Sequence, residues 1–318
     1  MARLVTVAAA AAIVATMAPA VAQEYPSKVV RIVTSEAGAG SDFVARLAAH
    51  GLTAAFGQQF IVDNRAGGVI AGDAVARSAP DGHTLLVYGN TLWLLPLMRK
   101  QMPYDPQRDF APVTLAARGL FVLVVHPSLP VKSVKELIAL ARARPGELNF
   151  STAAPGTTNH LASELFKSMA SVNMVRVSYR GATSALNALM SGDVQVMFPG
   201  VASVKPHMES GRIRVLAVAT AARSPQYPDL PTVAESGVPG FEAISATGFF
   251  VPARTPDAIV VRLNQEIVRV LQRSDVQQRM ASMGLEPVGS TPAQLAAMIK
   301  EEVMRMGRVI REAGIQER

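Results

Sequence analysis

VVRIVTSEAGAGSDF, residues 29–43, passes from a β-type run through a loop of small residues to the start of a predicted helix over 42–56. The β-branched residues of the run favour a buried strand. Gly38 and Gly40 let the backbone of the loop approach another group closely. The first N–H groups of a helix lack partners within the helix, and the helix dipole makes that end partly positive. The segment therefore predicts an α/β unit whose loop can hold an anion.

The alternation of strand and helix continues along the chain. FIVDN (60–64) and TLLVYG (84–89) are typical of strands, with a short helix to Ala79 between them, and two more strands are predicted within 110–126. A second run contains predicted strands over 147–153, 174–179, 194–200 and 213–220 and predicted helices over 133–144, 159–170 and 182–191. This alternation favours an α/β fold made of two runs, each with a parallel sheet that has helices on its faces.

The C-terminal part is predicted to be helical after SATGFFVPARTP, residues 245–256. Thr255 and Pro256 have the residue types of an N-cap and a first helical turn. The helix behind them carries an apolar stripe at Val260, Leu263, Ile267 and Val270. Helices over 275–283 and 292–312 complete the chain, and their apolar stripes predict packing on a core.

Residues 1–22 differ in kind from the rest. Arg3 precedes an apolar run from Leu4 to Met17, and Ala20-Val21-Ala22 has the form of a cleavage site. The alternative is a membrane anchor, but the run is shorter than the roughly 20 residues that span a bilayer. We therefore predict a cleaved signal peptide and a periplasmic protein. Because the chain has no cysteine, no disulfide is expected despite export.

Composition bounds the function. The chain has 318 residues, 49% of them hydrophobic, which is enough for two domains with a core each. The net formal charge is +7, and it is spread along the chain rather than gathered in basic runs with interleaved aromatic residues. We therefore expect no nucleic-acid partner. A mild attraction for anionic solutes is the simpler interpretation.

A second loop of small residues, in STAAPGTTNHL (151–161), also follows a predicted strand and precedes a predicted helix. Ligands of open α/β sheets bind beyond the carboxyl ends of the strands. Two such loops, one per domain, could hold a carboxylate from both sides through charge-assisted hydrogen bonds of about 1.5–3 kcal/mol each. The alternative is that both are tight turns with nothing bound. The candidate ligand-binding residues are Ser35, Glu36, Ala37, Gly38, Ala39, Gly40, Ser41 and Asp42 in the first loop, and Ser151, Thr152, Ala153, Gly156, Thr157, Thr158 and His160 in the second.

Signatures of catalysis are weak or missing. GAGSD (38–42) lacks the closing glycine of G-x-S-x-G, and GGVIAGD (67–73) lacks the lysine of a phosphate-binding loop. The five histidines are scattered, with no i, i+4 pair for a metal. His160 could act as a base, but a histidine that fixes the loop is the simpler interpretation. We predict no catalytic residue, metal or cofactor, and keep as alternative an exported α/β hydrolase that uses a loop serine with His160.

Seven segments carry a resemblance to a known family. They are DNRAGG (63–68), APDGHTLLV (79–87), PYDPQRDFAPVT (103–114), STAAPGTTNHLASELF (151–166), VSYRGATSALNALMSGDVQVMF (177–198), YPDLPTVAESGVPGF (227–241) and GFFVPARTP (248–256). In this order they resemble the solute receptors of tripartite tricarboxylate transporters, the TctC or Bug family. The resemblance runs almost from end to end of the mature chain.

The resemblance implies a two-lobed type II periplasmic-binding-protein fold with a two-strand hinge near 121–126 and 248–252. Domain 1 would comprise 23–121 plus 251–318, and domain 2 would comprise 122–250. It implies that a small organic acid is held by the two loops, with Tyr179, Gly181 and Phe198 completing the pocket. The resemblance also implies a monomer that delivers its solute to the permease subunits in the membrane. A ligand-dependent partner of a sensor protein has the same sequence features and stays an alternative.

One departure from the family concerns the first loop. The family pattern has an aromatic residue after proline, whereas this chain has Thr34-Ser35 followed by Glu36. If Glu36 points into the cleft, it would repel a second carboxylate and favour a ligand with an amine or amide. The alternative is that Glu36 faces solvent or a nearby arginine. The sequence does not name the carboxylate.

Overall fold

A computed structural model describes residues 25–35, 37, 40–65, 69–153, 156–208 and 210–316. The predicted signal peptide and Glu36 therefore lie outside the described residues. Within the described part, every helix is too short or too polar to cross a membrane.

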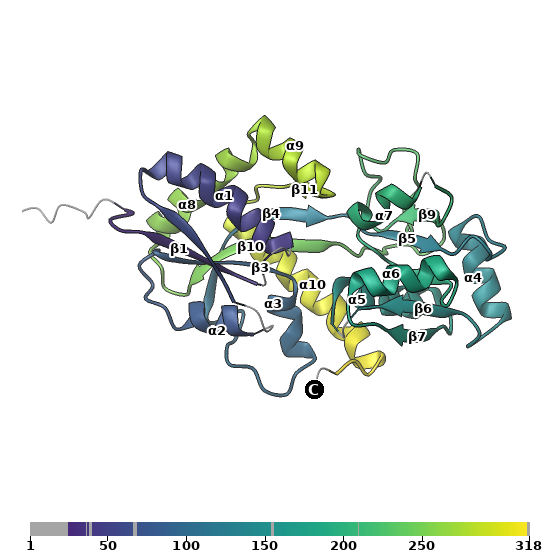
Figure 1. The fold of residues 1–318 in the computed structure, drawn as a ribbon. Helices are drawn as coiled ribbons and strands as arrows, with labels where there is room; N and C mark the ends of the chain where they lie inside the picture. The colour runs from purple at the N-terminus through teal and green to yellow at the C-terminus, as the bar shows by residue number, and fades with distance from the viewer. Residues whose placement is uncertain are drawn as a thin grey trace, which may run out of the picture.

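The described chain forms two lobes, each built on one sheet (Figure 1). The first sheet has the order β11-β4-β10-β3-β1-β2, and the second has the order β7-β6-β8-β5-β9. The strands of the first sheet are β1 (Val30–Thr34), β2 (Phe60–Asn64), β3 (Thr84–Gly89), β4 (Phe110–Gly119), β10 (Ser245–Pro252) and β11 (Leu285–Pro287). Those of the second are β5 (Val122–Val125), β6 (Asn149–Thr152), β7 (Val175–Ser178), β8 (Val196–Met197) and β9 (Arg214–Val218). The two-lobed α/β fold that we predicted is confirmed.

The prediction of purely parallel sheets is wrong, because each sheet is mixed. β1 pairs in parallel with β2 and β3, as β6 does with β7 and β8. In contrast, β10 is antiparallel to β3 and β4, and β5 is antiparallel to β8 and β9. The parallel strands end towards the opposite lobe. A strand that arrives from that lobe therefore enters the sheet in the reverse direction.

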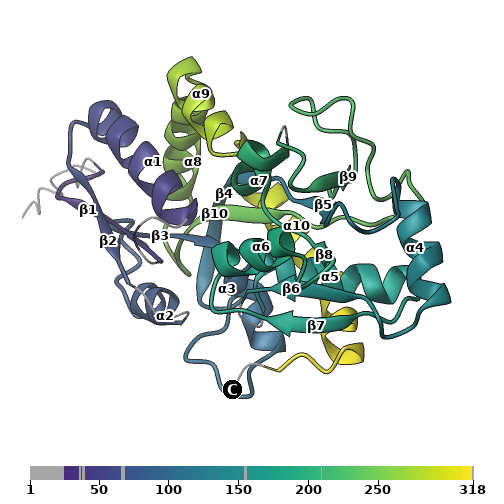
Figure 2. The same ribbon diagram turned by 45° about the vertical axis from the view of Figure 1, so that its right-hand side comes forward.

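Helices cover both faces of each sheet (Figures 1 and 2). They are α1 (Gly40–Phe56), α2 (Ile70–Ala76), α3 (Thr91–Leu94), the 3-10 helix η1 (Leu95–Leu97), α4 (Val134–Ala143), α5 (Thr158–Ala170), α6 (Ala182–Ser191), α7 (Val201–Met208), α8 (Asp257–Leu271), α9 (Ser274–Ser282) and α10 (Pro292–Glu312). Sequence patterns missed α3, η1, α7 and β11, which are too short to show a period. Thr255 is not the N-cap of α8: Pro256 holds that position, and the Thr255 hydroxyl donates to the carbonyl of Pro252 at 2.7 Å.

The buried residues explain how the lobes hold together. Side chains of α1 and α8 pack on one face of the first sheet, around Ile32, Leu85 and Leu263. A larger core begins on the other face and continues through α10 to α5, so that it includes residues of both lobes. The predicted apolar stripe of α8 is buried as expected. Helix α10 of the first lobe thus packs against α5, the helix that begins at the second loop.

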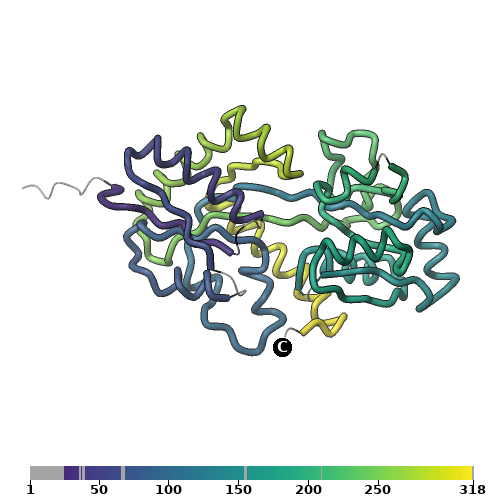
Figure 3. Tube along the Cα trace, viewed as in Figure 1, coloured from purple at the N-terminus to yellow at the C-terminus, as the bar shows by residue number. Residues whose placement is uncertain are grey.

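The chain crosses between the lobes twice (Figure 3). It passes from β4 to β5 through Leu120 and Phe121, and it returns between β9 and β10 through residues 219–244. The first crossing joins two interior strands, β4 and β5, whereas the return crossing leads from β9, at the edge of the second sheet, to the interior strand β10. The return strand β10 belongs to the first sheet from Ser245 onward.

Candidate functional site

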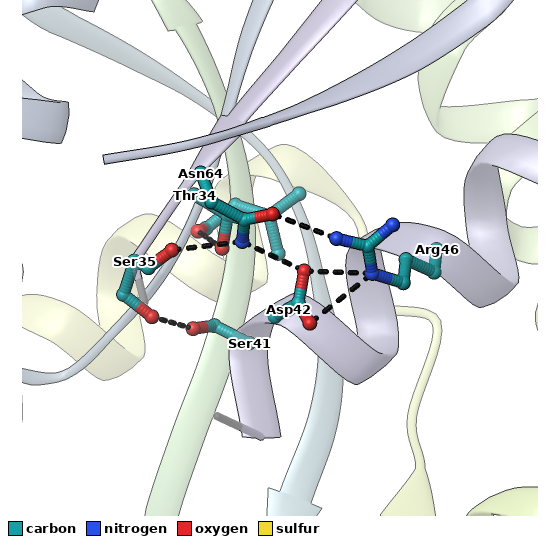
Figure 4. Close-up of polar contacts among 7 residues, drawn as sticks. Thr34, Ser35, Ser41, Asp42, Arg46 and Asn64 are labelled. Atoms are coloured by element: carbon teal, nitrogen blue, oxygen red, sulfur yellow. Dashed lines mark hydrogen bonds and ion pairs between the residues drawn. The ribbon is translucent and has the colours of Figure 1, made fainter. Parts of the chain in front are cut away.

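The first loop begins where β1 ends (Figure 4). The hydroxyl of Thr34 donates to the carbonyl of Val87 at 2.8 Å, which ties the end of β1 to β3. The hydroxyl oxygens of Ser35 and Ser41 lie 2.6 Å apart, so they bridge the two ends of the loop. Gly40, the first residue of α1, is exposed, and a Cβ placed there would meet nothing within 4 Å. The start of α1 is therefore open to a ligand.

Asp42 stabilises this loop from inside (Figure 4). Its carboxylate accepts from the side-chain amide of Asn64 at 2.8 Å and forms an ion pair with Arg46 at 3.0 Å. Asn64 also donates to the carbonyl of Ser35 at 2.9 Å, and Arg46 donates to Asn64 at 2.7 Å. The Asp42 side chain is only 6% exposed. These contacts give Asp42 a structural role in the loop. The sequence analysis did not identify its two partners, Asn64 and Arg46, as site residues.

Asn64 could have been found from the sequence. It lies in the DNRAGG segment, at the end of the strand that neighbours β1 in the sheet. Of the other first-loop candidates, Glu36, Gly38 and Ala39 lie outside the described residues, and Ala37 is exposed. The orientation of Glu36 therefore stays a prediction.

The second loop leads from β6 into α5. Thr157 is the N-cap of α5, but its side chain does not cap the helix and instead donates to the side-chain Oδ1 of Asn159 at 2.6 Å. Gly156 has φ +79°, a left-handed conformation that favours glycine. A Cβ on Gly156 would lie 2.9 Å from the methyl carbon of Met98, so the loop packs closely against the first lobe.

Three polar groups at this loop are buried without a partner. The hydroxyls of Ser151 and Thr152 and the side-chain amide nitrogen of Asn159 have no hydrogen-bond partner among the described residues. Ser151 and Thr152 are fully buried, and Asn159 is 5% exposed. Buried polar groups without partners are rare and costly, at about 1–3 kcal/mol each. Ser151 and Thr152 are consecutive residues at the end of β6, so their side chains lie on opposite faces of the sheet, and Asn159 is in the first turn of α5. Unpartnered polar groups at a strand end and at an uncapped helix start mark this place as a candidate binding site. Ala153 and Thr158 lie in the same turn.

His160 is buried within this turn and holds it. Its Nδ1 accepts from the backbone N–H of Gly156 at 3.0 Å, and its Nε2 contacts the guanidinium of Arg176 from β7. Burial, together with the positive charges of Arg176 and Lys167, lowers the pKa of His160 to about 4. The ring is therefore neutral at neutral pH. The geometry favours the loop-fixing interpretation, because the ring has no exposed surface for a solute.

The remaining candidates lie at the ends of β7 and β8. The N–H of Tyr179 donates to the carbonyl of Thr152 at 2.8 Å, which joins the two strand ends. Gly181 is the N-cap of α6, and a Cβ placed there would meet nothing within 4 Å. Phe198 is fully buried and packs against Phe166 and Phe241 in the core of the second lobe. It anchors the end of β8 in this core.

The helix starts of the two lobes are directed at one another. In Figures 1 and 2 the first residues of α1 lie at the side of the first lobe that faces the second, and β6 and β7 run towards the first lobe. The starts of α5 and α6 follow those strands. Such an arrangement offers backbone N–H groups and hydroxyls from both sides to an anion. Among the described residues, no three His, Asp or Glu side chains come close enough to hold a metal ion.

Known proteins resemble this chain along most of its length. A family model described as "Tripartite tricarboxylate transporter family receptor" matches residues 44–315. Protein BugT of Bordetella pertussis is 38% identical over 305 residues, which cover 93% of this chain and 93% of that protein. The solved structure "R. palustris Rpa4515 with adipate" has 38% sequence identity and a TM-score of 0.78, and covers 92% of this chain and 99% of that one. MatC from Rhodopseudomonas palustris, solved with bound malate, has 32% identity and a TM-score of 0.73, with coverage of 90% and 100%.

Proposed function

This chain belongs to the receptor family of tripartite tricarboxylate transporters, and we propose that it captures a small organic carboxylate between its lobes and delivers it to a membrane permease. The observation that carries the proposal is the set of buried, unpartnered polar groups of Ser151, Thr152 and Asn159 beside the uncapped start of α5. An anion that binds there gains hydrogen bonds and a favourable helix dipole.

The first loop supplies the opposite side of the clamp. The start of α1 presents backbone N–H groups, and the hydroxyl pair of Ser35 and Ser41 adds donors and acceptors. The contacts of Asn64 and Asp42 keep this loop in place before the solute arrives, which reduces the entropy cost of binding. Four or five charge-assisted hydrogen bonds would suffice for micromolar affinity, which requires about 8 kcal/mol.

Export and motion complete the proposed function. Residues 1–22 direct the chain to the periplasm and are then removed, and the mature receptor acts as a monomer without catalysis. We place the lobe boundaries at the two crossings, so that the first lobe resumes at Ser245, where β10 joins the first sheet, rather than at the expected residue 251. The lobes close about these crossings. The solved relatives with adipate and malate make dicarboxylates the first ligands to test.

The test measures binding of adipate and malate by calorimetry, with mass spectrometry of the recovered solute. We expect one solute per chain, recovered unchanged. Asn159→Asp replaces an unpartnered donor by a negative charge at constant size, and should weaken binding at least about tenfold, or 1.4 kcal/mol. Asn173→Asp, at an exposed position of the same lobe, is the matched control and should bind normally.

Two results would overturn the proposal. The first is equal loss of affinity in both variants, since this would reflect net charge rather than the site. The second is turnover of the solute, which would indicate an enzyme. A wider panel of mono- and dicarboxylates and amino acids then identifies the preferred solute.

A further inference from the structure

A cavity of ≈ 770 Å³ lies outside the two loops, between η1 and the C-terminal end of α10. Figure 1 shows the C-terminal end of α10, one of the two elements beside it. Leu97, which is half-buried, exposes apolar surface to the cavity, and the buried side chains of Met98, Ile310 and Ile315 line its base. Arg99, Lys100 and Arg311 line the same cavity. A volume of this size lies within the range of about 300–1,000 Å³ that is typical of small-molecule sites.

The apolar lining comes from the C-terminal ends of two elements, η1 and α10. At the end of η1, the N–H of Met98 donates to the carbonyl of Leu95 at 2.9 Å. At the end of α10, Gly314 takes a left-handed φ of +61°, and the N–H of Ile315 returns to the carbonyl of Ile310 at 3.0 Å. This is the hydrogen bond of a Schellman turn, which folds the residue after the glycine back towards the helix.

The charged side chains that line the cavity are all positive. None of the described residues that line the cavity is acidic. Within the described part of the chain, Lys100 and Arg311 form no ion pair, and both are exposed. The C-terminal end of α10 contributes roughly half a negative charge, which two full positive charges outweigh. Gly307 gives the Arg311 guanidinium room, because a Cβ there would lie 3.4 Å from Nη1.

We propose that this cavity is a second binding site, for an organic anion with an apolar body such as a medium-chain or aromatic carboxylate. The apolar lining at Leu97 receives the body, and Lys100 and Arg311 receive the carboxylate. A compact polyanion would leave the apolar surface empty, and a neutral apolar molecule would leave the cations unused. The two parts together select an amphipathic anion.

The position of the cavity connects it to the second loop. Met98 lines the cavity and also packs against Gly156, where an added Cβ would approach its sulfur to 3.1 Å. Because packed interiors transmit small displacements, an occupant that moves Met98 acts on the turn that His160 holds. This coupling, unlike the site itself, rests on the proposed function. It predicts that the second anion changes the affinity of the cleft for its solute.

The test uses octanoate as the probe and the protein without any other solute. We expect saturable binding, measured by calorimetry. Lys100→Glu combined with Arg311→Glu should weaken it at least about tenfold. The control is Lys205→Glu combined with Arg212→Glu, which makes the same change of charge at exposed positions of the second lobe.

The outcomes separate this site from the cleft. Asn159→Asp should leave octanoate binding unchanged, because Asn159 is not among the residues that line the cavity. Loss of octanoate binding in Asn159→Asp would place the probe in the cleft and overturn the proposal. So would equal affinity in both charge-reversal variants, or no binding by the wild-type protein at millimolar octanoate. For the coupling, octanoate should change malate or adipate affinity in the wild type, and Met98→Ala should reduce that change.

Discussion

Replacement of His160 tests how the second loop is held. The Nδ1 atom of the ring accepts from the N–H of Gly156 at 3.0 Å. His160→Asn keeps an acceptor oxygen near that position, whereas His160→Leu removes the acceptor and leaves a buried amide unsatisfied. We therefore expect the leucine variant to be less stable than the asparagine variant by about 1–3 kcal/mol, the cost of an unmade buried hydrogen bond.

The pH dependence of the free energy of unfolding gives a second test of His160. The pKa of His160 falls from 6.5 to about 4, because burial and the charges of Arg176 and Lys167 oppose protonation, while Glu164, 3.9 Å from Nε2, favours it. The unfolded chain therefore binds a proton at higher pH than the folded chain does. The stabilising contribution is complete above about pH 6.5 and is lost as the pH falls towards 4. A shift of this size corresponds to about 3 kcal/mol at 1.36 kcal/mol per pH unit.

The assay is urea unfolding followed by circular dichroism at about pH 7.5 and pH 4.5. Both proteins lose stability in acid through their carboxylates, so the difference between them isolates His160. We expect the wild type to lose about 2–3 kcal/mol more than His160→Asn across this range. Equal losses would refute the reasoning and show that the buried ring is protonated as easily as a free one. Stability of His160→Leu equal to that of His160→Asn would refute the role of the Gly156 hydrogen bond.

Two further predictions concern the first lobe. Asn64→Ala removes the donor to the Ser35 carbonyl and to Asp42 in the first turn of α1. We expect the free energy of unfolding to fall by about 1–2 kcal/mol and solute binding, measured by calorimetry, to weaken. Unchanged binding would show that the first loop is not part of the site. Burial raises the pKa of Glu302, which accepts from Asn90 and from the indole of Trp93, so its contribution to stability should decline as the pH rises above 4.5. Unfolding of Glu302→Gln between about pH 5 and pH 8 should lack this decline, and a variant with the wild-type slope would contradict the prediction.

Local sequence determined most of the elements. FIVDN and TLLVYG form strands with the predicted bounds, and the helices over 182–191 and 292–312 begin and end as expected. These elements are specified by β-branched runs, glycine and proline positions and caps, and such interactions act within a few residues. The two loops at helix starts could be identified for the same reason. The ordered family segments were also sufficient to predict the two-lobed fold and the receptor class.

Tertiary structure alone decided the directions of β5 and β10 and the partners of the loop residues. Asn64 lies 29 residues from Ser35, and Arg176 lies 16 residues from His160, so no local pattern links them. The cavity joins residues near 98 with residues near 311, which meet only when α10 packs beside η1. A strand or helix is selected by its own neighbours in sequence, whereas a partner across the fold is selected by packing of the whole chain. For this reason the sequence placed the helix starts, and the fold determined what holds each of them.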